Sequence, residues 1–151
     1  MNGRLIKRRP LREYLLFCET WLLLALSRSL IFFWPFRRLR LFLGNPVSHA
    51  EAEQVASELT TSEDLLKLIQ LSIIRAGHRS PWRTKCFEQA LAARMMLFRR
   101  RIQSVIFFGV HMNPEEPGKK MSAHAWLICS NYTVTGGKDN THFNIVGCFV
   151  K

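Results

Sequence analysis

Few acidic residues and no paired cysteines set the first limits on this 151-residue sequence. Eleven Asp and Glu stand against 22 Lys and Arg, which gives a formal net charge of +11. None of the four cysteines forms a CxxC pair, and the Cys and His spacings match no zinc motif. No small-residue cleavage site follows the basic start. We therefore expect a cytoplasmic protein with reduced thiols and without disulfides, metal or cofactor.

The sequence also lacks an unbroken apolar run of membrane-spanning length near its start. The most apolar part, "EYLLFCETWLLLALSRSLIFFWPF", is interrupted by Glu19 and Arg28. The uncharged stretch between these residues is far shorter than the ~20 apolar residues that a spanning helix needs. We expect a helix that is buried or lies at an interface, and no transmembrane anchor.

The positive charge is concentrated at one end. Residues 1–45 hold nine Arg or Lys against two Glu, a net charge of +7 out of +11. This asymmetry favours an anionic partner such as lipid headgroups, an acidic peptide or nucleic acid. The aromatic residues here follow helical packing rather than the spacing of a base-stacking platform, so no nucleic acid is expected. A solvated or partner-facing charge cluster explains the same residues.

Helical patterns fill the first two thirds of the chain. Apolar periodicity predicts a helix over 11–34, which Pro35 breaks, and a short basic-apolar continuation that ends at Gly44. Ser48 is a suitable cap for the following helix, and Thr61 for one that runs to Gly77. Thr84 can cap a further helix, "KCFEQALAARMMLFRRR".

Strand patterns follow the helices. "SVIFFGVHM", "AHAWLICS", "YTVT" and "HFNIVGCFV" are β-branched, aromatic or alternating. Helices first and strands after predict an α+β fold, with the helices packed on one face of an antiparallel sheet. We divide the chain into a basic helical segment, 1–45, and a core, 46–151, which together form one compact domain.

Cys86 is the first candidate for chemistry. It lies in the first turn of its predicted helix, where unpaired N–H groups and the positive end of the helix dipole favour a thiolate. Lys85 adds positive charge and Glu88 opposes it. A buried structural cysteine is the competing interpretation, since free cysteines are often buried.

His124 is the second candidate, 38 residues downstream at the start of a predicted strand. Trp126 on the same strand face could hold the imidazole against the start of the Cys86 helix, although a strand histidine is often structural. A third group commonly orients such a base. Asp139 is the acid that follows His124, and it is equally typical of a turn. The alternatives are Asn131, Asn140 and Asn144.

Two segments, "KCFEQALAARMMLFRRRIQSVIFFGV" and "SAHAWLICSNYTVTGG", resemble the transglutaminase-like cysteine peptidases of lasso peptide biosynthesis, the B protein of that family. In that family a Cys opens a helix rich in Ala and Leu, and a strand with Ala-His-Ala-Trp follows. "WPFRRLRLFLG" resembles the family's N-terminal part, so the resemblance covers nearly the whole chain.

The resemblance implies a transglutaminase-like, papain-like core that acts as a leader peptidase on a ribosomally synthesised lasso precursor (a RiPP). It implies Cys86 as nucleophile and His124 as general base and later acid. It also implies a macrolactam synthetase as partner. Independently of the resemblance, the basic segment makes the inner membrane face a candidate location for this cytoplasmic protein. A non-catalytic peptide-binding or scaffold protein of the same fold is the alternative.

The sequence departs from the family pattern in three places. Residues 1–50 leave no room for the leader-recognition module of fused relatives, so we expect the split form with a separate recognition protein. Gly136 stands where some relatives have an Asp, about twelve residues after the His. The two alternatives are that Asp139 replaces it or that Cys86 and His124 work as a dyad. Arg101 stands where a helix-ending Gly is often found.

Overall fold

The computed structural model describes residues 11–112, 121–137 and 140–151. Helices fill its first part and a sheet its second. The elements in chain order are α1 Leu11–Phe33, α2 Phe36–Leu43, β1 Asn45–Val47, α3 His49–Glu58, α4 Glu63–Arg79, α5 Cys86–Arg99, β2 Val105–His111, β3 Ser122–Cys129, β4 Tyr132–Thr135 and β5 Asn144–Val150.

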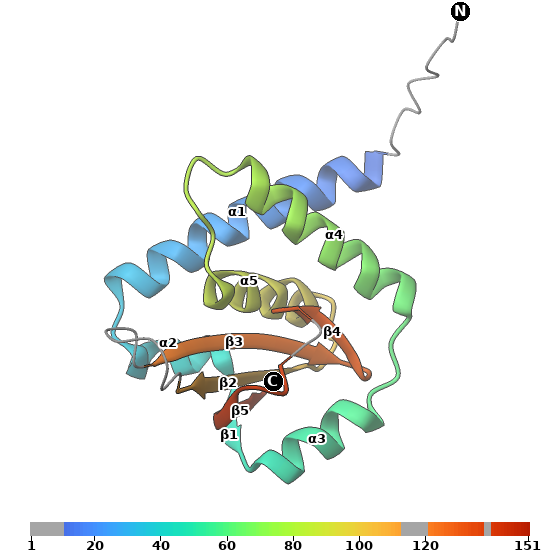
Figure 1. Cartoon of the computed structure of the whole chain (residues 1–151). Coiled ribbons are helices and arrows are strands. Elements are labelled where there is room, and N and C mark those ends of the chain that lie inside the picture. The colour runs from blue at the N-terminus through green and yellow to red at the C-terminus, as the bar shows by residue number, and fades with distance from the viewer. Residues whose placement is uncertain (1–10, 113–120, 138–139) are drawn as a thin grey trace, which may run out of the picture.

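The strands form one antiparallel sheet in the order β1-β5-β2-β3-β4. Helix α5 packs against one face of this sheet, and α1 and α4 lie over α5 (Figure 1). Helix α3 packs against the other face. The predicted α+β class is therefore confirmed. The expectation that the helices cover one face is wrong for α3, because the sheet is apolar on both sides.

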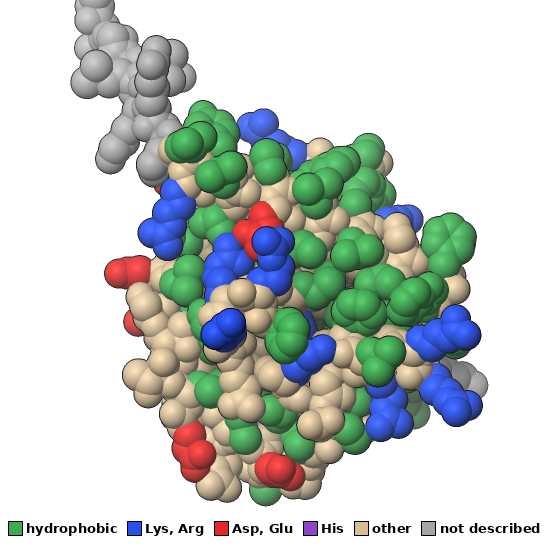
Figure 2. Space-filling view, turned by 180° about the vertical axis from the view of Figure 1, so that it is seen from behind, with side chains coloured by type: hydrophobic (Ala, Val, Ile, Leu, Met, Phe, Trp, Pro, Cys, Tyr) green, Lys and Arg blue, Asp and Glu red, His purple; other side chains and the backbone are tan. Residues whose placement is uncertain are grey.

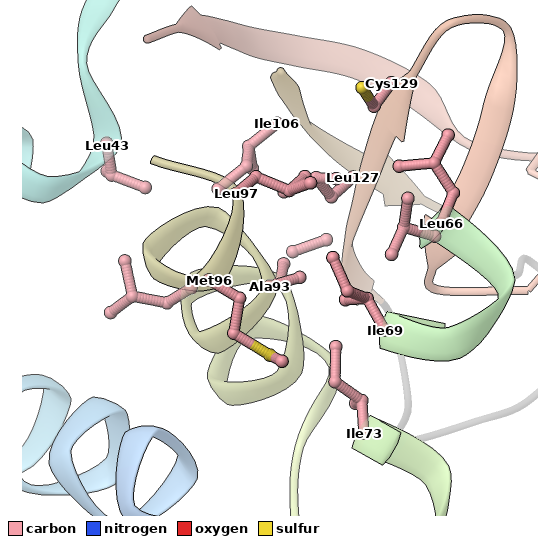
Figure 3. Close-up of a cluster of buried hydrophobic side chains, with 14 of the residues drawn as sticks. Leu43, Leu66, Ile69, Ile73, Ala93, Met96, Leu97, Ile106, Leu127 and Cys129 are labelled. Atoms are coloured by element: carbon pink, nitrogen blue, oxygen red, sulfur yellow. The ribbon is translucent and has the colours of Figure 1, made fainter. Parts of the chain in front are cut away.

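Strand alternation divides the core into two clusters, one on each face of the sheet. On β3, Ala125 and Leu127 belong to the cluster on the α5 face. Trp126 belongs to the cluster on the α3 face, where it meets Ala52 and Ala56 of α3. The α5-face cluster is the larger, and Figure 3 shows its side chains from α4, α5, β2 and β3.

A buried arginine fixes α5 to the sheet. Arg94 is 1% exposed, and its guanidinium donates hydrogen bonds to the carbonyls of Ser104 at 2.5 Å, Phe149 at 2.7 Å and Lys151 at 3.1 Å. Burial lowers the pKa of Arg94 to about 9, which leaves the guanidinium charged at neutral pH. Three carbonyl dipoles thus take the place of an acidic partner, and they tie the helix to residues at the ends of β2 and β5.

Most of the predicted helix boundaries are confirmed within two residues. Ser48 caps α3 by accepting a hydrogen bond from the Glu51 N–H, and Gly44 ends α2 with φ of 101°. Two predicted caps are wrong by one residue. Ser62 rather than Thr61 precedes α4, and Lys85 rather than Thr84 precedes α5, because Thr84 instead bonds to a side chain within the helix, Gln89.

Strand β1 was not predicted, since "NPV" reads as a loop. It pairs with β5 as an edge strand, the position in which a strand proline such as Pro46 is tolerated.

Helix α1 carries apolar residues on all sides. Its inner residues Leu16, Leu24 and Leu30 are buried against the domain. By length and composition α1 could cross a membrane, and 28% of its most apolar window is buried. Three of its four charged residues pair with the domain: Glu13 with Arg75 at 3.2 Å, Glu19 with Arg100 at 2.7 Å and Arg28 with Glu88 at 3.1 Å. The fourth, Arg12, is exposed near the start of the helix.

Candidate active site

Cys86 is the first residue of α5. Its side chain is half-buried and packs against the core cluster on the α5 face. The neighbouring Glu88 carboxylate is buried, accepts the Lys85 backbone N–H at 3.2 Å, and pairs with Arg28 of α1. The Glu88 charge would disfavour a thiolate at Cys86, and the ion pair with Arg28 partly neutralises it.

The N-terminus of α5 offers backbone donors beside the thiol. Lys85 occupies the cap position, and its ammonium has no lone pair with which to accept a hydrogen bond from the first turn. The N–H groups at the start of α5 therefore lack the oxygen cap that Ser48 supplies to α3. Uncapped N–H groups at a helix start are suited to bind a developing oxyanion.

His124 lies near the start of β3, opposite Gly109 of β2. Its ring is half-buried between two aromatic neighbours, stacked on Trp126 at 5.8 Å and tilted against Phe143 at 5.0 Å between ring centroids. A Cβ at Gly109 would lie 2.9 Å from the Trp126 ring, so glycine there leaves room for this stack. The prediction that Trp126 shares a strand face with His124 is confirmed.

The carbonyl of Gly136 fixes the tautomer of His124. Nε2 lies 2.7 Å from the Gly136 carbonyl oxygen, which can only accept a hydrogen bond. Nε2 must therefore carry the proton, and in the neutral ring the lone pair is on Nδ1. Gly136 is the position where the family resemblance suggested an aspartate, so its main chain supplies the acceptor that a side chain would have supplied.

Cys86 and His124 lie at the same end of the sheet but on opposite faces. Phe87 contacts Phe108 at 5.1 Å between centroids, and Phe108 pairs with Ala125, the neighbour of His124. The ring of His124, however, packs with the α3-face cluster. No hydrogen bond joins the two side chains in the described residues. The expectation that His124 faces the α5 N-terminus is therefore wrong, because alternation along β3 turns it away from Ala125 and α5.

In the described residues, no strand pairs with the β4 side of β3 beside His124. Strand β4 pairs with β3 only between Cys129 and Leu127, where Thr135 is its last residue. Beyond Leu127 the backbone of Gly136, rather than a paired strand, runs beside β3.

The other candidates for the group that orients His124 lie elsewhere in the fold or outside the described residues. Asp139 falls in the segment that the structure does not describe. The Asn140 amide donates to the Gly137 carbonyl at 3.1 Å, Asn131 N–H bonds to Ala56 of α3, and Asn144 pairs within the sheet. The Nδ1 atom of His111 lies 2.9 Å from the His142 carbonyl. These polar groups make contacts typical of structural roles.

Two features of the site were not predicted from the sequence. The Gly136 carbonyl was missed, although the double glycine signals a backbone with positive φ, which is 92° at Gly136 and 79° at Gly137. The Arg28–Glu88 pair was missed because it joins α1 to α5 across 60 residues. No local pattern predicts such a partner.

A model of the transglutaminase-like superfamily matches residues 30–147. The chain belongs to the transglutaminase-like superfamily. The match contains Cys86 and His124, and it extends into the C-terminal end of α1. The comparisons with curated proteins and with solved structures found no match. The superfamily includes cysteine peptidases and transglutaminases, so the predicted transglutaminase-like fold is confirmed and a cysteine peptidase is consistent with it.

Proposed function

We propose that this chain is a cysteine peptidase that removes the leader from a ribosomally synthesised precursor peptide of the lasso type. The observation that carries the proposal is the position of Cys86, the first residue of an uncapped helix in a transglutaminase-like chain. A thiol placed there can attack a carbonyl while helix N–H groups bind the oxygen.

Catalysis would proceed through a thioester. The Cys86 sulfur attacks the scissile carbonyl, the thiol proton passes to His124 Nδ1, and the first-turn N–H groups of α5 bind the oxyanion. His124 then protonates the leaving amine, the C–N bond breaks, and an acyl group remains on sulfur. Water, deprotonated by the same nitrogen, hydrolyses the thioester and regenerates the thiol.

The Gly136 carbonyl supports the base in this scheme. It keeps the proton on Nε2, so Nδ1 is the nitrogen that accepts the thiol proton. A neutral carbonyl orients the ring but stabilises the imidazolium less than a carboxylate does. Asp139 remains the candidate for that charge.

The proposed dyad requires the two side chains to approach each other around the open edge of β3. In the structure Cys86 packs against the cluster on the α5 face, whereas His124 stacks on Trp126 of the cluster on the α3 face. We propose that the bound precursor, presented by a separate leader-recognition protein, stabilises the paired arrangement. A macrolactam synthetase is the proposed consumer of the released core peptide.

A non-catalytic peptide-binding protein is the second candidate. It is favoured by an open cleft of about 720 Å³ between α3 and the sheet, lined by residues that include Glu53, Phe107 and Trp126. Neither Cys86 nor His124 lines this cleft. A peptide bound there would leave the thiol unused.

The two candidates are separated by mixing the purified chain with a candidate precursor and recognition protein and weighing the products. We expect Cys86→Ala to abolish cleavage while precursor binding persists. Cys18→Ala is the matched control, because Cys18 is an exposed cysteine on α1, and this variant should cleave like wild type. Cleavage by Cys86→Ala would show that the nucleophile is another residue, and an intact precursor with the wild-type chain and all partners would favour the binding protein.

A further inference from the structure

The outer side of α1 is apolar and uncovered in the described structure. Opposite its buried residues, a mostly apolar stripe with three- and four-residue steps faces outward: Leu15, Cys18, Leu22, Leu26, Ser29 and Phe33. Phe33 is 78% exposed and Leu22 62% exposed. Figure 2 shows hydrophobic side chains gathered on this side of the molecule, with Lys and Arg beside them. An apolar stripe of this extent is unusual on a surface that meets only water.

The turn from α1 into α2 adds positive charge to this stripe. We define the corner patch as Phe32, Phe33, Arg37, Arg38 and Arg40. All five side chains are exposed, and the three arginines make no ion pair with the described residues. Residues 29–48 contain no Asp or Glu. The patch therefore combines uncovered aromatic rings with cations that no nearby acid neutralises.

This combination selects the partner. A second copy of the chain would place the same arginines against each other or against a chain of net charge +11. An anionic lipid surface satisfies both halves of the patch, because phosphates bind the guanidinium groups while the aromatic rings enter the region below the headgroups. We propose that α1 and the corner patch bind an anionic membrane surface.

The contacts of α1 indicate that it lies along the membrane and does not span it. Glu19 and Arg28, on the side turned to the domain, form ion pairs with Arg100 and Glu88. Spanning would break these pairs and carry both charges into hydrocarbon. Lying in the interface leaves them intact and uses only the outward stripe.

The corner patch lies at the Cys86 end of the molecule. Phe36, the first residue of α2, contacts Phe108 at 6.3 Å between centroids, and Phe87 contacts the same ring at 5.1 Å. Membrane binding would therefore bring the start of α5 close to the lipid surface. The lipid-binding proposal is independent of the catalytic one, since it rests on other residues.

The test is co-sedimentation of the full chain with vesicles of phosphatidylcholine containing 30% phosphatidylserine (about one lipid in three), compared with pure phosphatidylcholine. We expect binding to the anionic vesicles that falls steeply with salt. Each arginine near such a surface contributes roughly a fivefold factor, so Arg37→Gln/Arg38→Gln should weaken binding by roughly 30-fold. Phe32→Ser/Phe33→Ser should weaken it by about tenfold or more.

A matched control removes the same charge elsewhere. Lys67→Gln/Arg101→Gln neutralises two exposed cations away from α1, the patch and the start of α5, and should change binding by less than about threefold. Circular dichroism of each variant checks that it is folded. The proposal is overturned if the wild-type chain binds neither vesicle, if it binds both equally, or if the patch arginine variant and the control variant lose equal affinity. It is also overturned if the patch variants bind vesicles as the wild type does and lose only their binding to a partner protein or to an oligonucleotide.

Discussion

Replacement of Arg94 tests whether the main-chain carbonyls at the ends of β2 and β5 hold α5 in place. Arg94→Met keeps the apolar stem but removes three hydrogen bonds from a charged donor. Such bonds contribute about 1.5–3 kcal/mol each before the guanidinium's desolvation is subtracted. The carbonyls of Ser104 and Lys151 keep a second, backbone partner, which reduces the loss. We expect a destabilisation of about 2–4 kcal/mol.

The assay is urea unfolding at pH 7, monitored by circular dichroism, with the m-value compared between variants. Arg99→Met is the matched control on the same helix, because the Arg99 side chain is 65% exposed and pairs loosely with Glu19 at 3.5 Å. It should cost less than about 1 kcal/mol. If Arg94→Met unfolds within about 0.5 kcal/mol of wild type, the arginine is not what anchors α5.

Three further predictions concern backbone and burial. Arg101 has φ of 58°, so Arg101→Gly should raise the free energy of unfolding by roughly 1 kcal/mol, measured in urea. A Cβ at Gly136 would lie 2.3 Å from the Trp126 Cβ, so Gly136→Ala should destabilise the fold by more than about 2 kcal/mol and abolish cleavage. Gly137→Ala, whose Cβ meets nothing within 4 Å, should cost only about 1 kcal/mol and retain cleavage; equal losses would contradict a specific role for the Gly136 carbonyl. Burial raises the pKa of Cys148 from 9.0 to about 11, so the unfolded chain loses this proton first as pH rises. Stability from the buried thiol should therefore fall between pH 9 and 11, by at most about 2.7 kcal/mol, and urea titrations of Cys148→Ala should lack this component.

Local signals in the sequence predict the elements of this fold well. Pro35 and Gly44 delimit α2, and Ser48 caps α3, because each acts through its own backbone or side chain within one turn. Alternation in "AHAWLICS" correctly predicts β3 and puts His124 and Trp126 on one face. Even Arg101, in the place of a helix-ending glycine, adopts the left-handed backbone that the position demands.

The arrangement of those elements depends on contacts that local patterns do not contain. The sequence predicts Cys86 at a helix start and His124 on a strand, but not which face of the sheet the helix covers. That choice follows from the summed burial of α1, α4 and α5 on one side. For the same reason the sequence does not predict the contact between His124 and the Gly136 carbonyl, a main-chain group 12 residues further along the chain.

The functional account depends on Cys86 and His124 acting as one unit although they begin on opposite faces of the sheet. The most direct test is kcat/KM for precursor cleavage by Cys86→Ala, His124→Ala and the double variant, with the recognition protein present. A cooperating pair predicts that each single change lowers kcat/KM by about 10³-fold or more and that the double variant is no worse than either. A His124→Ala enzyme with near wild-type kcat/KM, or losses that multiply in the double variant, would contradict the proposed pair.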